Sequence, residues 1–256
     1  RNDTFIFVDR FDNGVPPPSA PNFNNGTTAS YSTVGTFGPE SGGLLQLNTA
    51  QGVLTTNAAG AARRSLRAAL DTNTNSDPAF DDRGLKIDDT LLVQATFNLG
   101  VPLGPRLNGF AIRFSDRSLA TGLLNQSADL NVLFNPTTGK AELRWLLQDF
   151  GAGTTTGFGS TDLVLPPDGA DQIRLQIARP DVTSKDFFAS WIFIKGGFAS
   201  GTGSFATGIG LFNGERFVRA EFLAFEDVPA VPLPGTLWLL GAGLLAGLGF
   251  ARRRRA

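Results

Sequence analysis

The stretch D-L-N-V-L-F-N-P-T-T-G-K-A-E-L-R-W-L-L, Asp129 to Leu147, decides the fold class. Two runs of strand-forming residues, Asp129 to Phe134 and Ala141 to Leu147, flank the turn sequence Asn135 to Lys140. Because proline presets one turn residue and Gly139 can adopt a positive φ, the stretch predicts a β-hairpin. Hydrophobic residues alternate with charged ones on the second arm, as expected of a strand with one buried face.

The same period-two alternation recurs along most of the chain. Phe110, Ile112 and Phe114 form one apolar face, and Ile173, Leu175 and Ile177 form another. The run Asp186 to Lys195 is apolar on both faces, which predicts a central, covered strand. Further strands are expected at Thr4 to Phe11, Leu44 to Asn48, Val53 to Thr56, Thr90 to Leu99, Gly109 to Ser115, Gln172 to Ala178 and Arg216 to Glu226.

Two segments interrupt this pattern. Asn57 to Leu70 has helical composition, but Gly60 weakens a helix, and a loop followed by a strand fits equally. The glycine-rich Lys195 to Ser204 lacks the G-K-[ST] ending of a phosphate loop, so a flexible hairpin loop is expected. Some dozen strands without βα alternation predict an all-β protein, a two-sheet antiparallel sandwich.

Several of these features resemble concanavalin A-like (laminin-G-like) jelly rolls. The first strand ends in Asp9-Arg10-Phe11, the N-P-T-T-G-K hairpin lies mid-chain, and a long last strand precedes the C-terminal segment. The resemblance implies one jelly-roll exodomain over residues 1–227.

The C-terminal segment has three parts in a fixed order. A proline-rich linker and motif occupies residues 228–235, and an uncharged apolar run of 16 residues follows from Thr236 to Ala251. This run predicts a hydrophobic transmembrane helix, slightly short for a bilayer unless it starts at Leu233 or the bilayer thins locally. The arginine cluster in residues 252–256 should stay on the cytoplasmic side of the membrane, which places the exodomain on the outer side. A plain membrane anchor or a buried core helix are the alternatives.

The order of these parts resembles the PEP-CTERM sorting signal of Gram-negative bacteria. The residues that carry the resemblance are Pro232, Leu233, Pro234, Gly235, Arg252, Arg253, Arg254 and Arg255. Leu233 stands where the family's tripeptide usually has Glu, which leaves the exosortase subtype open. The resemblance implies insertion in the inner membrane, removal of the signal by exosortase, and release to the outer surface or extracellular matrix.

Composition agrees with export and excludes several kinds of chemistry. The 256 residues contain no Cys, Met or His, so thiolate chemistry and zinc, copper or haem sites are not expected. Because the chain starts at Arg1, we expect a leader to have been removed. Without the terminal arginines, 18 basic and 23 acidic residues remain, and this mild acidity argues against a nucleic-acid partner.

The acidic loop Asp71 to Asp82 is a candidate calcium site. Oxygen ligands at alternate positions can surround one hard cation. Ser76 replaces the usual turn glycine and position 12 is one carbon shorter than Glu, so a solvated surface loop is the alternative. The candidate ligands are Asp71, Asn73, Asn75, Asp77 and Asp82, and a second, weaker group is Asp9, Asp12 and Asp227.

Catalytic and sugar-binding residues are less clearly marked. The nearest match to a glycosidase carboxylate pair is Glu221 to Glu226, whose five-residue offset places the two glutamates on opposite strand faces. No catalytic residues are therefore expected. Trp145 and Trp191 are candidate sugar platforms, with core packing as the alternative because both have apolar partners on the same face.

Three hypotheses of function follow. The first is a non-catalytic surface or biofilm-matrix protein that binds glycans, with calcium support. The second is a self-assembling protein that forms a filament or coat through exposed strand edges. The third is a glycan-active enzyme.

Overall fold

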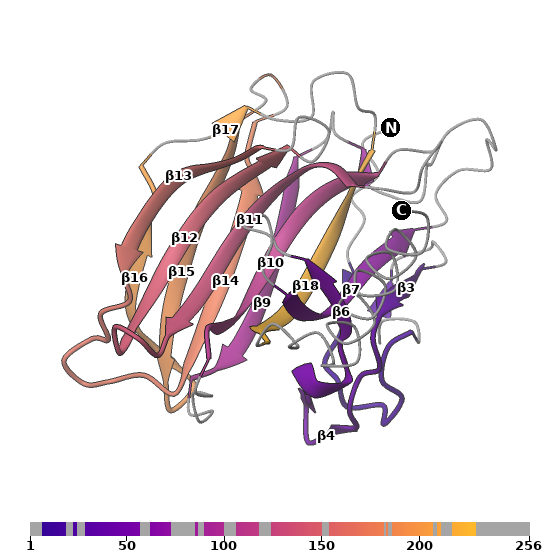
Figure 1. The fold of residues 1–256 in the computed structure, drawn as a ribbon, viewed down its shortest axis with the longest axis horizontal. Helices are drawn as coiled ribbons and strands as arrows, with labels where there is room; N and C mark the ends of the chain where they lie inside the picture. The colour runs from indigo at the N-terminus through magenta and orange to yellow at the C-terminus, as the bar shows by residue number, and fades with distance from the viewer. Residues whose placement is uncertain are drawn as a thin grey trace, which may run out of the picture.

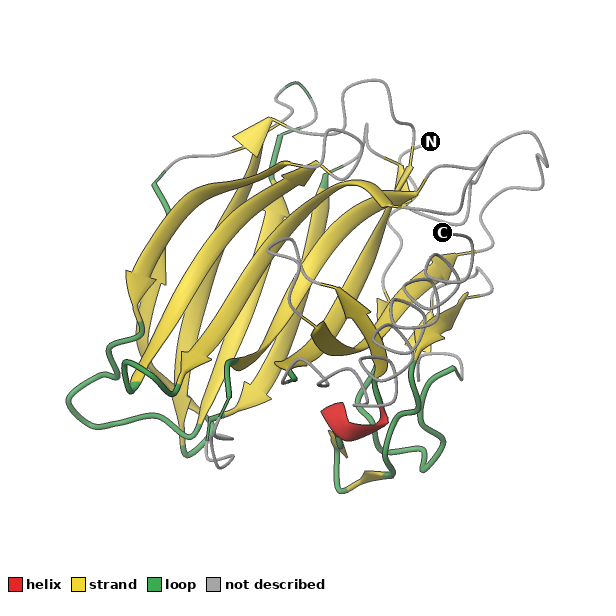
Figure 2. Ribbon diagram, viewed as in Figure 1, coloured by secondary structure: helices red, strands yellow, loops and turns green. Residues whose placement is uncertain are grey.

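The chain forms an antiparallel all-β structure in two main layers (Figures 1 and 2). The computed structural model describes residues 7–18, 23–24, 29–56, 62–72, 85–86, 90–99, 106–117, 124–149, 154–181, 183, 186–206, 209–210 and 217–228. One 3₁₀ turn, η1 (Thr49–Gln51), is the only helix within these ranges, so the described part is all-β as predicted.

The larger sheet contains nine strands and has β10 and β18 near its middle. Its main order is β13-β12-β11-β10-β18-β7-β3, while β6 also pairs with β7 and β8 with β18. The strands are β3 (Ala29–Val34), β6 (Val53–Thr56), β7 (Ala62–Thr72), β8 (Leu85–Lys86), β10 (Asn108–Arg117), β11 (Leu124–Asn135), β12 (Lys140–Asp149), β13 (Thr154–Asp162) and β18 (Phe217–Asp227).

The smaller sheet contains five strands in the order β16-β15-β14-β9, with β17 pairing part of β15. Figure 1 shows it behind the larger sheet. Its strands are β9 (Leu91–Asn98), β14 (Gln172–Arg179), β15 (Asp186–Lys195), β16 (Phe198–Ser204) and β17 (Ile209–Gly210). Two further pairs are β1 (Phe7–Val8) with β2 (Phe23–Asn24) and β4 (Glu40–Ser41) with β5 (Leu44–Leu45).

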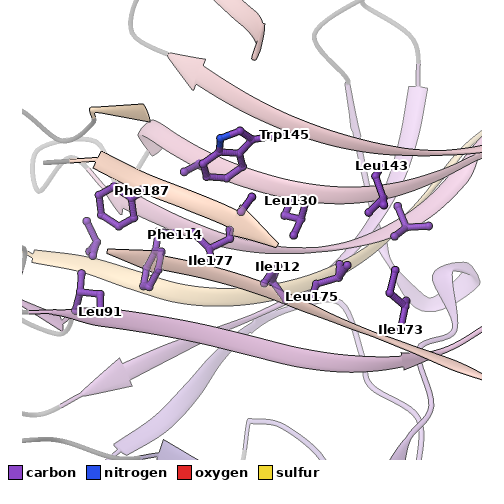
Figure 3. Close-up of a cluster of buried hydrophobic side chains, with 14 of the residues drawn as sticks. Leu91, Ile112, Phe114, Leu130, Leu143, Trp145, Ile173, Leu175, Ile177 and Phe187 are labelled. Atoms are coloured by element: carbon purple, nitrogen blue, oxygen red, sulfur yellow. The ribbon is translucent and has the colours of Figure 1, made fainter. Parts of the chain in front are cut away.

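The core lies between the two sheets and is built from the alternating positions. Ile112 and Phe114 of β10 meet the inward residues of β14, all at 0% exposure. Figure 3 shows Trp145, Leu130 and Phe187 in the same cluster. Alternation therefore identified the buried face of these strands correctly, because one side of each faces the opposite sheet.

Two hairpins show how far local turn chemistry predicts structure. The predicted hairpin is β11–β12, with Gly139 at φ 66° in its turn. The predicted loop Lys195 to Ser204 is instead a tight turn followed by β16, which corrects that expectation. Gly196 and Gly197 have φ values of 57° and 86°, the positive pair that a two-residue hairpin turn requires.

The segment Asn57 to Leu70, for which the sequence allows either a helix or a loop and a strand, contains the start of β7 in its described part. Ala62–Thr72 is a strand, so the helical alternative is wrong there. Leu66 and Ala68 are completely buried in the sheet, and this tertiary packing outweighs the helix propensity of an Ala- and Arg-rich run.

The first and last described strands belong to different sheets. β1 pairs with β2, whereas β18 pairs with β10 and β7. Within the ranges given above, no helix has the length and apolar character needed to cross a membrane. The expected helix Thr236 to Ala251 lies outside those ranges.

Candidate functional site

The outer face of the smaller sheet carries a set of linked hydrogen-bonding side chains. Gln172 Nε2 donates to Asn98 Oδ1 at 2.8 Å, and Gln176 Nε2 donates to Gln94 Oε1 at 3.0 Å. The Ser190 hydroxyl on β15 donates to Gln176 Oε1 at 3.2 Å, which extends the set to a third strand. We name this set the polar ladder: Gln94, Thr96, Asn98, Gln172, Arg174, Gln176 and Ser190.

Arg174 lies in the middle of the polar ladder. Its Nε donates to Thr96 Oγ1 at 3.3 Å, between the two amide pairs. The described residues supply no further partner for its two Nη groups. A guanidinium whose terminal nitrogens face solvent can bind a carboxylate or two neighbouring hydroxyls in a bidentate manner.

An apolar row borders the polar ladder at one end. Ala178 pairs with Leu92 on one side and with Phe188 on the other. Leu92 is 58% exposed and Phe188 is 38% exposed. β15 is a central strand as predicted, but the prediction that it is covered on both faces is wrong, because Phe188 lies on an exposed outer face. An apolar row beside convergent polar groups suits a ligand with both C–H faces and hydroxyl edges.

The outer face of the larger sheet carries a buried charge network instead. Arg113 on β10 donates to Asp129 on β11, and its Nη1 lies 3.7 Å from Glu221 Oε2 on β18. Ser115 donates to Glu221 Oε1 at 2.7 Å, and Arg67 Nε lies 3.9 Å from Glu221 Oε2. The network ties four neighbouring strands together.

Burial controls the electrostatics of this network. The Asp129 and Glu221 side chains are 1% and 0% exposed. Burial raises the pKa of Asp129, and the Arg113 guanidinium opposes that shift. Both carboxylates share one guanidinium, an arrangement that keeps buried charges paired. Glu221 and Glu226 lie on opposite faces, as the residue spacing predicted, and Glu226 accepts from Thr49 at 3.0 Å.

The candidate calcium ligands are largely beyond what the structure describes. Asp71 lies on β7 opposite Ser30, and its side chain is outside the description. Asn73, Asn75, Asp77 and Asp82 lie outside the described residues. Among the residues that are described, no group of three or more potential metal-ligating side chains is arranged to hold an ion.

The second acidic group, Asp9, Asp12 and Asp227, does not assemble. Arg63 Nε binds Asp227 at 2.6 Å. Asp9 and Asp12 instead lie near Glu40, which is 6% exposed. Burial raises the pKa of Glu40, and the two aspartates raise it further.

Both tryptophans lie on the inner side of the sandwich. Trp145 is 0% exposed within the core cluster (Figure 3), where a surface ligand does not reach it. Trp191 packs 5.5 Å from Phe205 and covers Gly203, where an added Cβ would lie 2.3 Å from the indole ring. Core packing, the alternative to a sugar platform, describes both positions.

Sequence reasoning did not select the polar ladder. Its residues are the polar half of the same alternation that revealed the core. They become a surface only because β14 pairs with β9 on one side and with β15 on the other, in a register that no short motif encodes. The tail residues Pro232 to Gly235 and Arg252 to Arg255 lie outside the described residues.

Comparison with solved structures defines the fold class. The chain is similar to the CBM2 module of the evolved Dit protein of Lactobacillus casei BL23 phage J-1, with a TM-score of 0.51 and 10% sequence identity. The match covers 87% of each chain, and at this identity it supports the β-sandwich fold alone. A comparison with curated proteins gives no match.

Comparison with protein families identifies the tail. Residues 230–255 match the PEP-CTERM protein-sorting motif. The motif confirms the predicted sorting signal and implies export, transient membrane anchoring and recognition by exosortase.

Proposed function

We propose that this protein is a non-catalytic component of the bacterial outer surface or extracellular matrix that binds polysaccharide. The polar ladder carries the proposal. It places amides, hydroxyls and the Arg174 guanidinium on one sheet face beside the exposed Leu92 and Phe188. The sorting motif at residues 230–255 supports a location where extracellular polysaccharide is present.

The fold likeness adds limited support. The similar sandwich is named a CBM2 module, and this name supports polysaccharide as the class of ligand to test. Function depends on the site rather than on the fold, so the residues of the polar ladder must carry the binding. The seven residues of the polar ladder include amides and one cation but no carboxylate, a composition that favours neutral or acidic polysaccharides over basic ones.

Binding of the full-length chain to a panel of neutral and uronate-containing polysaccharides tests the proposal. Arg174→Met should weaken binding by about tenfold or more, since a hydrogen bond to a charged group contributes roughly 1.5–3 kcal/mol. Arg144→Met is the matched control, because Arg144 is exposed on the other sheet and pairs with Glu142 at 2.8 Å. Absence of binding to the whole panel contradicts the function, and equal binding by Arg174→Met contradicts the site.

Calcium support remains part of the proposal. The loop Asp71 to Asp82 has the spacing of oxygen ligands that would hold the ion. Repeating the binding measurement with calcium and with a chelator checks this: Asp77→Asn should remove any calcium-dependent component and leave the calcium-free affinity unchanged. Equal affinity of the wild-type chain under both conditions contradicts a supporting role for calcium.

A further inference from the structure

The side of β9 that faces away from β14 is an edge of the smaller sheet. β9 pairs with β14 alone among the described strands. The inward residues of β14 are all buried, whereas Val93, Ala95 and Phe97 on the same face of β9 are half-buried. This difference is expected where a sheet ends and no described strand continues it.

The described residues of β9 lack the sequence and pairing features by which natural proteins often protect an edge strand. Its sequence, L-L-V-Q-A-T-F-N, contains no charge, proline or glycine, and its pairing with β14 has no register shift. The pairings of the two other long edge strands, β13 and β16, each contain a shift. β3 and β6, which also border the larger sheet, have only 6 and 4 residues. β9 is therefore the described edge best suited to accept another strand.

The hydrogen-bond pattern shows which peptide groups face this edge. Leu99 N donates to Asp171 O at 2.9 Å, so odd-numbered residues of β9 bond to β14. The alternation of an antiparallel ladder then directs the peptide groups of the even-numbered residues outward. These residues are Leu92, Gln94, Thr96 and Asn98.

We propose that β9 pairs with β9 of a second copy of this chain, antiparallel and centred on Ala95. This register places Gln94 opposite Thr96 and Leu92 opposite Asn98, and uses all four outward-facing residues. On the inner face it places Val93 opposite Phe97, a β-branched and aromatic pair of the kind that stabilises sheets. A register shifted by one residue would pair inward-facing residues of one copy with outward-facing residues of the other, so the inner apolar positions would no longer meet.

The pairing closes on itself and joins the two smaller sheets into one. Because the same strand is used by both copies, the interface is isologous and gives a dimer, not a filament. The polar ladders of both copies then form one surface, with the two Arg174 residues roughly 15 Å apart by strand spacing. A linear polymer could contact both.

The absence of cysteine makes a disulfide test specific. In the proposed register Ala95 faces itself in a non-hydrogen-bonded pair, where the Cα atoms are about 4.5 Å apart and within disulfide reach. Full-length Ala95→Cys should form a disulfide-linked dimer on mild oxidation. Val93→Cys alone should stay monomeric, but a mixture of Val93→Cys and Phe97→Cys should cross-link.

Two controls separate this pairing from chance collision. Ser190→Cys lies on β15 of the same sheet and should not cross-link. Adding Gln94→Lys and Thr96→Lys to Ala95→Cys should abolish the dimer, since lysines would then face each other across the edge. A second Ala95→Cys variant that carries Gln94→Glu and Thr96→Glu should restore the cross-linked dimer when it is mixed with the lysine variant. A monomeric Ala95→Cys, or equal cross-linking at Ser190→Cys, overturns the proposal.

Discussion

Arg113 is the residue on which the outer face of the larger sheet most depends. It contacts Asp129 and lies 3.7 Å from Glu221, and both carboxylates are almost fully buried. Arg113→Met should lower the free energy of unfolding by about 3–5 kcal/mol, because it leaves two buried charges without their shared partner. Chemical denaturation measures this loss.

Arg144→Met is the control for that measurement. Its side chain is 42% exposed and its ion pair with Glu142 lies at the surface, so the expected change is below about 1 kcal/mol. Equal losses in the two variants would contradict a special role for the buried network.

Glu40 gives a prediction about pH. Burial and then the charges of Asp9 and Asp12 raise its pKa above the ordinary value for Glu. A carboxyl whose pKa rises on folding favours the folded state at low pH and loses that contribution as pH increases through the folded pKa. Glu40→Gln should therefore raise the Tm at neutral pH, and the gain should disappear in acid. Thermal melts across pH check this, and a gain independent of pH contradicts it.

At the scale of elements, the β11–β12 hairpin is the part most fully predicted from sequence. Gly139 has a φ of 66°, and no atom lies within 4 Å of the position that an added Cβ would take. Gly139→Ala should cost about 1–2 kcal/mol, through backbone strain alone. Gly139→Asn should cost less, because Asn tolerates this conformation, and denaturant melts compare the two. Equal stability of the wild-type protein and the two variants would contradict a requirement for a positive φ at residue 139.

Other elements needed information that is not local. The sequence predicts a loop in place of β16, because Gly201 and Gly203 weaken a strand pattern. The structure places Pro166 and Trp191 where their side chains would be. These glycines allow large neighbours to cross the strand, which no pattern within residues 198–204 reveals. No local pattern predicts the polar ladder for a related reason, since its members come from three strands whose pairing is set by the whole core.

At the scale of the molecule, the two sheets have different outer faces. The larger sheet carries a buried, paired charge network, whereas the smaller sheet carries the half-buried Arg174 and the exposed Leu92 and Phe188. The first arrangement stabilises the sandwich, and the second is available for a ligand. Pairing through β9 would extend the second face without disturbing the first.

The sorting motif at the C-terminus follows the described sandwich in the sequence. Residues 230–255 match a sorting motif, and the described sandwich ends at residue 228, directly before it. The chain should therefore fold as a sandwich outside the membrane and then lose its tail, while the polar ladder is retained.

Intact mass spectrometry of the protein collected from outside the producing cells tests that sequence of events. A chain that contains the sandwich and lacks the segment from Trp238 to Ala256 is expected. Arg252 to Arg255 replaced by alanines should reduce the amount of this shortened form. Recovery of the protein from outside the cells with Trp238 to Ala256 still attached would contradict sorting by cleavage. A permanent membrane anchor would then be the remaining interpretation of the tail.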